Sequence, residues 1–271
     1  MVIEGIPRIA GMVYAVSATT IIVLLLRRRR FNKKAGYIFL AASTFLGFLI
    51  FAPMLPYQFQ MVILGNTGQI GGPLPMAIAG LGIIAALTIV AGRVFCGYVC
   101  PIGTVQELPY DIPTKKFGVR NKSLPVIVRY VFLAAFVVMA VISSTGLLNY
   151  LGIRDFFYLN TSSAFFYVFL GVVVASIFFY RPFCRFACPY GVILSLASIK
   201  SRFRLKRNGN CTDCAICEEE CPTLEAGRDD RKQECYQCQR CVYICPYDAI
   251  DYTTNRGVII DGMKSGVIHK P

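Results

Sequence analysis

Five long apolar stretches constrain the fold of this chain more than any other feature of the sequence. They cover residues 7–26, 36–55, 75–94, 126–148 and 163–182 approximately. At 1.5 Å per residue in a helix, each is long enough to cross a hydrocarbon core of about 30 Å. Hydrophobic residues make up 55% of the 271 residues, and the mean hydropathy is +0.56. We therefore expect an all-α polytopic membrane domain over residues 1–190, solvated mainly by lipid.

Basic residues are concentrated in every second loop between these stretches. Lys and Arg accumulate on the cytoplasmic side of a membrane protein, so this pattern predicts an outer N-terminus and a cytoplasmic C-terminal segment in a prokaryotic inner membrane. The first stretch lacks a small-residue cleavage site and is interpreted as a signal anchor. The loops on the opposite side, about 56–74 and 149–162, contain one basic residue, Arg154. The basic groups are Arg27–Arg30 with Lys33 and Lys34, then Lys115, Lys116, Arg120 and Lys122, then Arg185 and the basic residues of Lys200–Arg207.

The net charge of +13 does not indicate a nucleic-acid partner. Residues 1–208 contain 21 Lys and Arg against 4 Asp and Glu, whereas residues 209–256 contain 5 and 10. The excess of positive charge therefore borders the apolar stretches, where it sets topology, and it does not form a phosphate-binding face.

Eight of the twelve cysteines lie between Cys211 and Cys245, in two copies of the pattern C-x2-C-x2-C-x3-C-P. This pattern holds cubane [4Fe-4S] clusters, and the fourth cysteine of each copy binds the cluster of the other copy. The sequence predicts a small α+β domain with two clusters at 209–252, resembling the two-cluster bacterial ferredoxins. The predicted ligands are Cys211, Cys214, Cys217 and Cys245 for the first cluster and Cys221, Cys235, Cys238 and Cys241 for the second.

Two other uses of these cysteines explain less of the pattern. Zinc sites also use C-x2-C pairs, but they do not need two identical four-cysteine runs that each end in proline. Disulfide scaffolds belong to small secreted domains, and this segment is predicted to face the cytoplasm.

The other four cysteines lie in a short internal repeat. Residues 93–108 (RVFCGYVCPIGTVQEL) and 181–196 (RPFCRFACPYGVILSL) share R-x-F-C-x3-C-P-x-G, which implies two related helical units with a site between them. If the turn is helical, the cysteines of each copy are i and i+4 and share a face, and the prolines open the next helix. Arg93 and Arg181 are interpreted as anchors at the membrane border.

The role of these four thiols stays open at the level of the sequence. Cys96, Cys100, Cys184 and Cys188 could hold a third iron–sulfur cluster, act as redox-active dithiols, or bind a soft metal such as Cu(I) or Zn(II). Buried cysteines often act simply as small apolar residues, but that does not explain a duplicated motif.

The combination of these motifs resembles the membrane ferredoxins of the periplasmic nitrate reductase NapH type, with relatives in methylamine utilisation and nitrous-oxide respiration. The resemblance covers roughly residues 35–252. It implies a quinol dehydrogenase component that passes electrons between the membrane pool and protein partners in a redox complex. The additional N-terminal span departs from the four spans that are usual in this family.

Other redox cofactors are not expected. The one histidine, His269, cannot supply two ligands to a haem, and neither an S/T-G-A-T flavin attachment site nor a G-x-G-x-x-G nicotinamide fingerprint is present. A quinone site needs an apolar slot near the bilayer edge with a proton acceptor. The candidates are Gln106, Glu107, Tyr110, Asp111 and Arg129, although Glu107 and Asp111 could equally pair with Lys115 and Lys116 at the surface.

We interpret residues 191–208 as a basic linker at the inner interface and 253–271 as a tail. The leading hypothesis is an iron–sulfur electron-transfer subunit that links the quinone pool or a cytoplasmic donor to a partner reductase. The alternative is a factor for copper reduction or cofactor maturation that uses the C-x3-C-P dithiols. Whether the chain is an enzyme or only a subunit of one is open.

Overall fold

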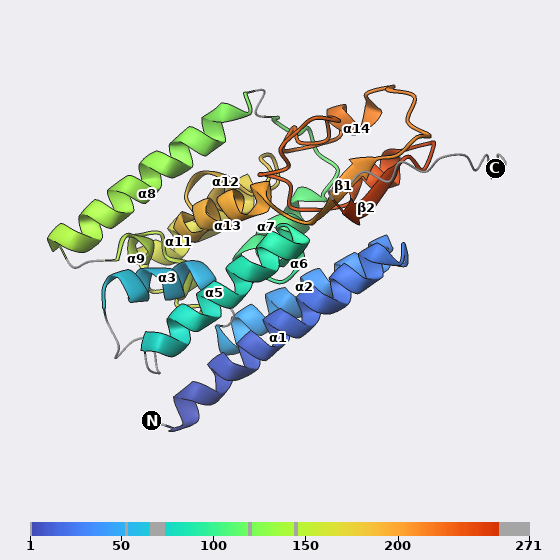
Figure 1. Ribbon diagram of the computed structural model, residues 1–271. Coiled ribbons are helices and arrows are strands. Elements are labelled where there is room, and N and C mark those ends of the chain that lie inside the picture. Colours follow the sequence, from blue (N-terminus) through green and yellow to red (C-terminus); the bar gives the residue numbers. More distant parts are fainter. Residues whose placement is uncertain (1, 52–53, 66–73, 119–120, 144–145, 255–271) are drawn as a thin grey trace.

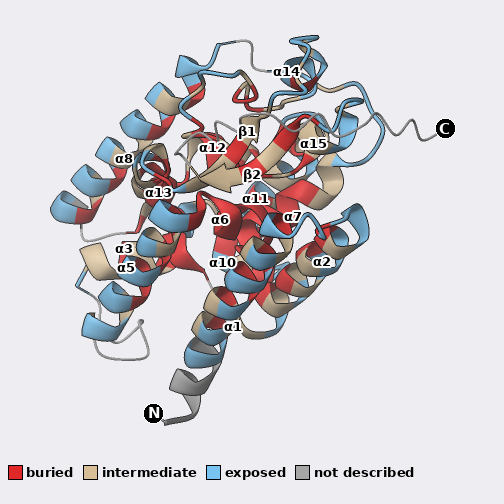
Figure 2. Ribbon diagram, turned by 45° about the vertical axis from the view of Figure 1, so that its right-hand side comes forward, coloured by how far each residue is buried: buried red, intermediate tan, exposed pale blue. Residues whose placement is uncertain are grey.

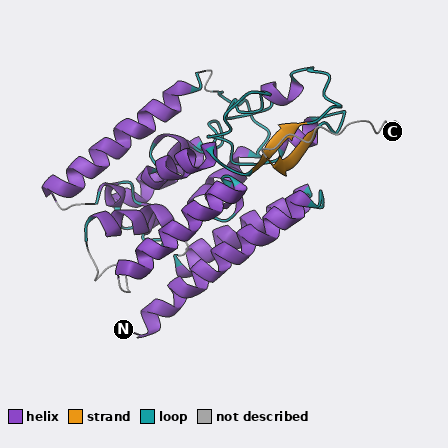
Figure 3. Ribbon diagram, viewed as in Figure 1, coloured by secondary structure: helices purple, strands orange, loops and turns teal. Residues whose placement is uncertain are grey.

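The computed structural model describes residues 2–51, 54–65, 74–118, 121–143 and 146–254, and these are mostly helical with one two-stranded sheet (Figures 1 and 3). The tail from residue 255 onward, including His269, lies outside the described residues.

Four helices of the described residues are long and apolar enough to cross a membrane, and they match the first four predicted stretches. Their outward faces expose large apolar side chains such as Ile38 and Val141. Figure 2 shows exposed residues, in pale blue, alternating with buried residues, in red, along these helices. This distribution suits a lipid environment. The four helices are α1 (Val2–Arg27), α2 (Lys33–Ile50), α5 (Leu74–Ala91) and α8 (Ser123–Ser143).

The fifth predicted span is shorter than the sequence suggested. Helix α11 (Ala164–Ala175) has 12 residues, which corresponds to a length of about 18 Å. The rest of the apolar stretch forms turns, and the carbonyls that are left free there accept hydrogen bonds from the segment before α8: Lys116 Nζ donates to Ile177 O and Phe117 N–H to Phe178 O. Hydropathy counts Phe178 and Phe179 as part of a span, whereas both pack on Phe117.

The two copies of the repeat have the same order of elements, a helix followed by a one-turn helix and a third helix. The first copy consists of α5, α6 (Val94–Tyr98) and α7 (Pro101–Tyr110), and the second of α11, α12 (Pro182–Phe186) and α13 (Pro189–Ile199). Helix α13 packs against α5, and α7 packs against α11, so each copy packs against the other. Short helices α3 (Leu55–Ile63), α9 (Leu147–Tyr150) and α10 (Ile153–Phe157) complete the membrane part.

The C-terminal part begins and ends with two strands that pair antiparallel, β1 (Phe203–Arg207) and β2 (Ile250–Thr254). Between them in the sequence lie the short helices α14 (Ile216–Glu219) and α15 (Arg240–Ile244). The segment 191–208, interpreted as a linker, instead contains most of α13 and all of β1. Leu205 and Tyr252 are opposite each other and buried, which gives this basic segment an apolar inner side.

The C-terminal part covers the end of α5 and caps it. Helix ends leave carbonyls without partners, and here Ala91 O accepts hydrogen bonds from Gln237 Nε2 (2.8 Å) and Tyr252 Oη (2.7 Å). Gly92, with φ +70°, turns the chain at this point, and a Cβ there would overlap the Gln237 amide. Figure 1 accordingly shows the sheet lying over the ends of the long helices.

Candidate functional site

Three cavities are each lined by four cysteines. The first lies between the two repeats and is lined by the membrane-edge quartet, Cys96, Cys100, Cys184 and Cys188. All four are buried. The C-x3-C-P motifs, 88 positions apart in the sequence, therefore meet at one place.

The other two cavities separate the eight remaining cysteines into two sets of four. One cavity is lined by the proximal quartet, Cys221, Cys235, Cys238 and Cys241. The other is lined by the distal quartet, Cys211, Cys214, Cys217 and Cys245. The fourth cysteine of each motif lies with the first three of the other motif, which is the arrangement expected from the spacing.

The thiols of each quartet surround a cavity and do not converge on one point. Among the described residues, no three His, Cys, Asp or Glu side chains are grouped closely enough to hold a single metal ion.

The membrane-edge quartet is built by a break in each repeat, and the expected continuous helical turn is not formed. Helix α6 ends at Tyr98, and Cys100 has an extended ψ of 117° before Pro101 opens α7; Cys188 and Pro189 do the same for α13. Each second cysteine is thus the N-cap of the next helix, and the two cysteines of a copy do not share one face of a single helix.

Hydrogen-bond donors point at sulfur atoms in all three quartets. Gly191 N–H lies 3.2 Å from Cys188 Sγ and Gln106 Nε2 3.5 Å from Cys184 Sγ. In the C-terminal part, Glu225 N–H donates to Cys221 Sγ (3.3 Å) and Ala249 N–H to Cys245 Sγ (3.4 Å). Such bonds stabilise thiolates and tune the potentials of iron–sulfur clusters, so the donor set fits that group.

Arg93 is fully buried and is not the border anchor that the sequence suggested. With Arg129 it holds one carboxylate, that of Glu234: Arg93 Nη1 lies 3.2 Å from Glu234 Oε2 and Arg129 Nη2 2.6 Å from Oε1. Burial raises the pKa of this carboxyl, but the two guanidinium groups outweigh that effect and the pKa is lowered. An ionised Glu234 thereby joins the C-terminal part, to which it belongs, to Arg93 and Arg129 of the membrane part.

Arg181 is buried in a second group of the same composition. Its Nε lies 2.5 Å from Glu107 Oε2, and Arg240 Nη1 lies 2.6 Å from Glu107 Oε1. Burial again opposes ionisation, and the arginines again lower the pKa of the Glu107 carboxyl. Arg181 also donates to the carbonyls of Cys96 and Gly97 and so clamps the turn that carries the first cysteine.

The two Arg–Glu–Arg groups are related through the repeat. Glu107 of the first copy aligns with Ser195 of the second. Ser195 has no carboxylate, but its side chain is hydrogen-bonded to Glu234. The C-terminal part therefore supplies the carboxylate that the second copy lacks.

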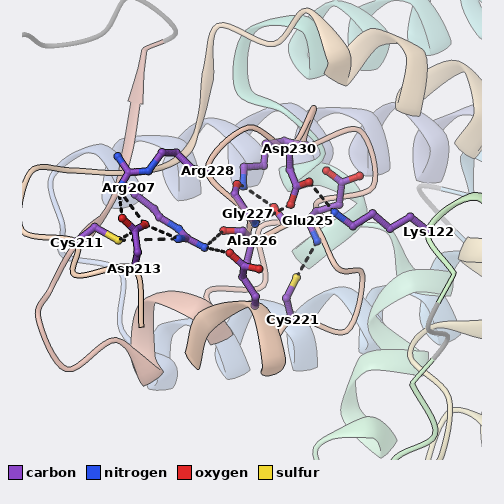
Figure 4. Close-up of polar contacts among 12 residues, drawn as sticks. Lys122, Arg207, Cys211, Asp213, Cys221, Glu225, Ala226, Gly227, Arg228 and Asp230 are labelled. Atoms are coloured by element: carbon purple, nitrogen blue, oxygen red, sulfur yellow. Dashed lines mark hydrogen bonds and ion pairs between the residues drawn. The ribbon is translucent and has the colours of Figure 1, made fainter. Parts of the chain in front are cut away.

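Arg207 organises the loops of the C-terminal part, as Figure 4 shows. It pairs with Asp213 (3.2 Å) and Glu218 and donates to Ala226 O, while its Nη1 lies 4.0 Å from Cys211 Sγ. In the same view Lys122, just before α8, reaches Asp230 at 2.6 Å. These contacts fix the cysteine loops both to each other and to the membrane helices.

Neighbouring cavities share wall residues. Tyr236 lines both the membrane-edge and the proximal cavity, and Arg207 and Ile250 line both the proximal and the distal cavity. The Nε atoms of Arg93, Arg129 and Arg207 are buried without a hydrogen-bond partner among the described residues. Buried cationic donors beside thiol-lined cavities are suited to an anionic group.

A larger cavity of about 260 Å³ lies between α2, α6, α7 and α15. Two of the five predicted quinone-site residues, Glu107 and Asp111, line it. Gln106 faces Cys184, Tyr110 packs on Tyr180, and Arg129 holds Glu234, so these three do not line it. Cys238, predicted as a cluster ligand, also lines this cavity.

The residues that sequence reasoning missed are Tyr37 and Arg240 on this cavity, and Glu234 and Tyr236. The sequence signal that could have identified Glu234 is the excess of arginines over carboxylates in and near the repeats, since buried arginines need acidic partners from another part of the chain.

Comparison with known proteins places the repeat in a recognised family. A family model described as a 4Fe-4S binding domain matches residues 73–120 and 164–208, which are the two C-x3-C-P units. Uncharacterized protein MJ0750 of Methanocaldococcus jannaschii is 34% identical over 72% of this chain and 83% of its own length. The chain belongs to the NapH-type family of membrane ferredoxins.

Other relatives carry names that agree with this assignment. The putative electron transport protein YccM of Escherichia coli is 27% identical over 74% of this chain and 60% of its own length. The ferredoxin-type protein NapH of Haemophilus influenzae is 24% identical over 67% and 70%. No solved structure matches the chain. This membrane ferredoxin is thus an iron–sulfur protein of the electron-transport type.

Proposed function

We propose that this membrane ferredoxin carries electrons between a membrane quinone and a partner reductase through three iron–sulfur clusters, one at each cysteine quartet. The observation that carries the proposal is the row of three cysteine-lined cavities with shared walls. A bound [4Fe-4S] cluster accepts and returns one electron at a time. The protein supplies thiolates, N–H donors to sulfur and fixed spacing.

The charge around the membrane-edge quartet supports a cluster there in preference to free dithiols. Arg93, Arg129 and Arg181 are fully buried close to these thiols, while Glu107 and Glu234 are each shared between two arginines. An uncompensated buried cation is unfavourable. An anionic cluster with four thiolate ligands would offset this excess of positive charge.

The proposed orientation places the C-terminal ferredoxin part in the cytoplasm. Arg29, in the basic run after α1, pairs with Asp248 at 2.8 Å and with Asp251 of β2. The ferredoxin part therefore lies on the same side as the basic loops, which is the cytoplasmic side by the distribution of Lys and Arg.

The proposed quinone site is the cavity of about 260 Å³ between α2, α6, α7 and α15. Tyr37, Leu40 and Tyr98 give it apolar walls, Glu107 and Asp111 provide carboxylates, and Cys238 of the proximal quartet reaches it. A quinol bound there would lie beside a proton acceptor and a cluster ligand. We expect Asp111→Asn to slow quinol-dependent reduction without loss of iron, while Glu219→Gln, an exposed carboxylate outside the cavity, leaves it unchanged.

The test of the three-cluster relay is iron and acid-labile sulfide per chain, with EPR of the reduced protein, after anaerobic purification. We expect about twelve irons in the wild type and about eight in Cys96→Ser/Cys184→Ser, because one four-iron cluster is lost. About eight irons in both would contradict a membrane-edge cluster. Stoichiometric copper on the remaining thiols would then favour the metal-handling function instead.

A further inference from the structure

Tyr236 stands between two of the quartets. It follows Cys235 of the proximal quartet directly in the chain, and its side chain lines both the membrane-edge and the proximal cavity. It is 1% exposed, so it is enclosed by protein on all sides.

One arginine from each repeat holds the ring. The guanidinium carbon of Arg93 lies 4.2 Å from the ring centroid and that of Arg181 5.0 Å, and Arg93 Nη2 donates to the Tyr236 hydroxyl at 3.2 Å. The rings of Tyr180 and Tyr236 pack in a T-shaped arrangement, with their centroids 5.9 Å apart. Cation–π contacts of this kind are strongest where water is excluded, so the ring has little freedom to move.

The backbone at Tyr236 is also the point where the ferredoxin part lies directly on the first repeat. A Cβ at Gly97 would overlap Tyr236 O. Gly97 follows Cys96, so the glycine allows the segment after Cys235 to approach the turn that carries a membrane-edge thiol.

From these contacts we infer that Tyr236 is the bridging residue for electron transfer between the membrane-edge and proximal quartets, and that Arg93 and Arg181 are positioning residues that hold its ring. The inference rests on the proposed relay. With clusters bound at both quartets, the step would transfer one electron from the reduced cluster to the oxidised one, and it would form or break no bond and move no proton. The ring supplies continuous packed contact between the two sites.

The experiment follows the order in which clusters are reduced. Anaerobic protein is mixed with dithionite, a water-soluble reductant that meets the ferredoxin part first, and samples are freeze-quenched for EPR. The membrane-edge signal is identified by its absence from Cys96→Ser/Cys184→Ser. The variants are Tyr236→Leu and Tyr236→Met, which remove the ring, Tyr236→Phe, which keeps it, and Phe157→Leu as control.

Phe157 is a matched control because it is a buried aromatic residue of the membrane part that lines neither the membrane-edge nor the proximal cavity. We expect both ring-deleting variants to reduce the ferredoxin clusters at the wild-type rate and the membrane-edge cluster more slowly, by roughly tenfold, which corresponds to about 1.4 kcal/mol of barrier. Tyr236→Phe and Phe157→Leu should retain the wild-type order and rate. If neither ring-deleting variant takes up iron, Arg93→Lys, which keeps the charge but loosens the ring, should show the same delay.

Equal rates in wild type, Tyr236→Leu and Phe157→Leu would overturn the inference while leaving the relay intact. A delay as large in Phe157→Leu as in Tyr236→Leu would also overturn it. Absence of a membrane-edge signal in the wild type would overturn the three-cluster relay itself, and the two failures are therefore distinguishable.

Discussion

The two C-x3-C-P repeats share their sequence signature, yet their arginines hold different partners. Arg181 of the second copy reaches into the first copy and binds Glu107 and the carbonyls of Cys96 and Gly97. Arg93 of the first copy instead reaches into the ferredoxin part, to Glu234 and Tyr236. One arginine joins the two halves of the membrane part, and the other joins the membrane part to the ferredoxin.

The difference arises from one unmatched position, Glu107 against Ser195. The second copy has Ser195 where the first copy has a carboxylate, so Arg93 of the first copy and Arg129 of α8 pair with Glu234 of the ferredoxin part. A second pair of aligned positions is used in the same way: Gly97 admits the carbonyl of Tyr236, and Arg185 donates to the carbonyl of Pro222 at 3.1 Å. Two of the positions at which the copies differ are thus used where the ferredoxin docks.

The largest effect should come from Glu234→Gln. Removing one partner of a buried ion pair leaves uncompensated charge, here on Arg93 and Arg129, and typically destabilises by about 3–5 kcal/mol. We expect a lower midpoint of thermal unfolding in detergent and faster proteolysis within residues 208–249. Glu219→Gln is the control because Glu219 is exposed; an equal response of the two variants would contradict the docking role.

Moving the carboxylate would sharpen this result. In Glu234→Ser with Ser195→Glu, the second copy regains the residue found in the first. We expect the membrane part to recover its stability while residues 208–249 stay sensitive to protease, because the charge now satisfies Arg93 without involving the ferredoxin. Recovery of both together would show that Glu234 is not needed for docking.

A smaller effect is expected for Gly97→Ala. The added methyl group would overlap Tyr236 O, a backbone atom that cannot rotate away, and overpacking of this kind destabilises by roughly 1–3 kcal/mol. Gly82→Ala is the control, since a Cβ there meets nothing within 4 Å. The measurement is again thermal unfolding, and a Gly97→Ala protein as stable as Gly82→Ala would mean that the two parts are less closely apposed.

The smallest effect is expected for Ser195→Ala. It removes one hydrogen bond to a carboxylate that keeps both arginines, a loss on the order of 1 kcal/mol. Thermal unfolding should show a slight shift, compared with none for Ser17→Ala, an exposed serine of α1 that bonds only within its own helix. A loss as large as that of Glu234→Gln would mean that Ser195, and not the arginines, fixes the carboxylate.

Local patterns made the long helices and the grouping of the cysteines predictable. Apolar length identified α1, α2, α5 and α8, and the C-x2-C-x2-C-x3-C-P spacing predicted which cysteines line each ferredoxin cavity. Hydropathy failed at Ser176–Arg181, where an apolar sequence forms turns because neighbouring donors satisfy its carbonyls.

The partners of the arginines were not predictable, because they are distant in the chain. Arg93 and Glu234 are 141 positions apart, and Arg129 and Glu234 are 105 apart. Nothing in the local sequence distinguishes Glu234 from the exposed acidic residues nearby, such as Glu218. Only the packing of the ferredoxin onto the repeats makes the distinction.

The pairing of β1 with β2 also sets an order of events during synthesis. β1 leaves the ribosome directly after the last membrane helices, but its partner follows only after the whole segment 208–249 has been made. Until then the ferredoxin loops have no closing ribbon and remain accessible to whatever delivers iron and sulfide. The second strand completes the sheet, caps α5 through Tyr252 and meets Arg29, which directly follows the first helix, so it joins the earliest and latest described segments of the chain.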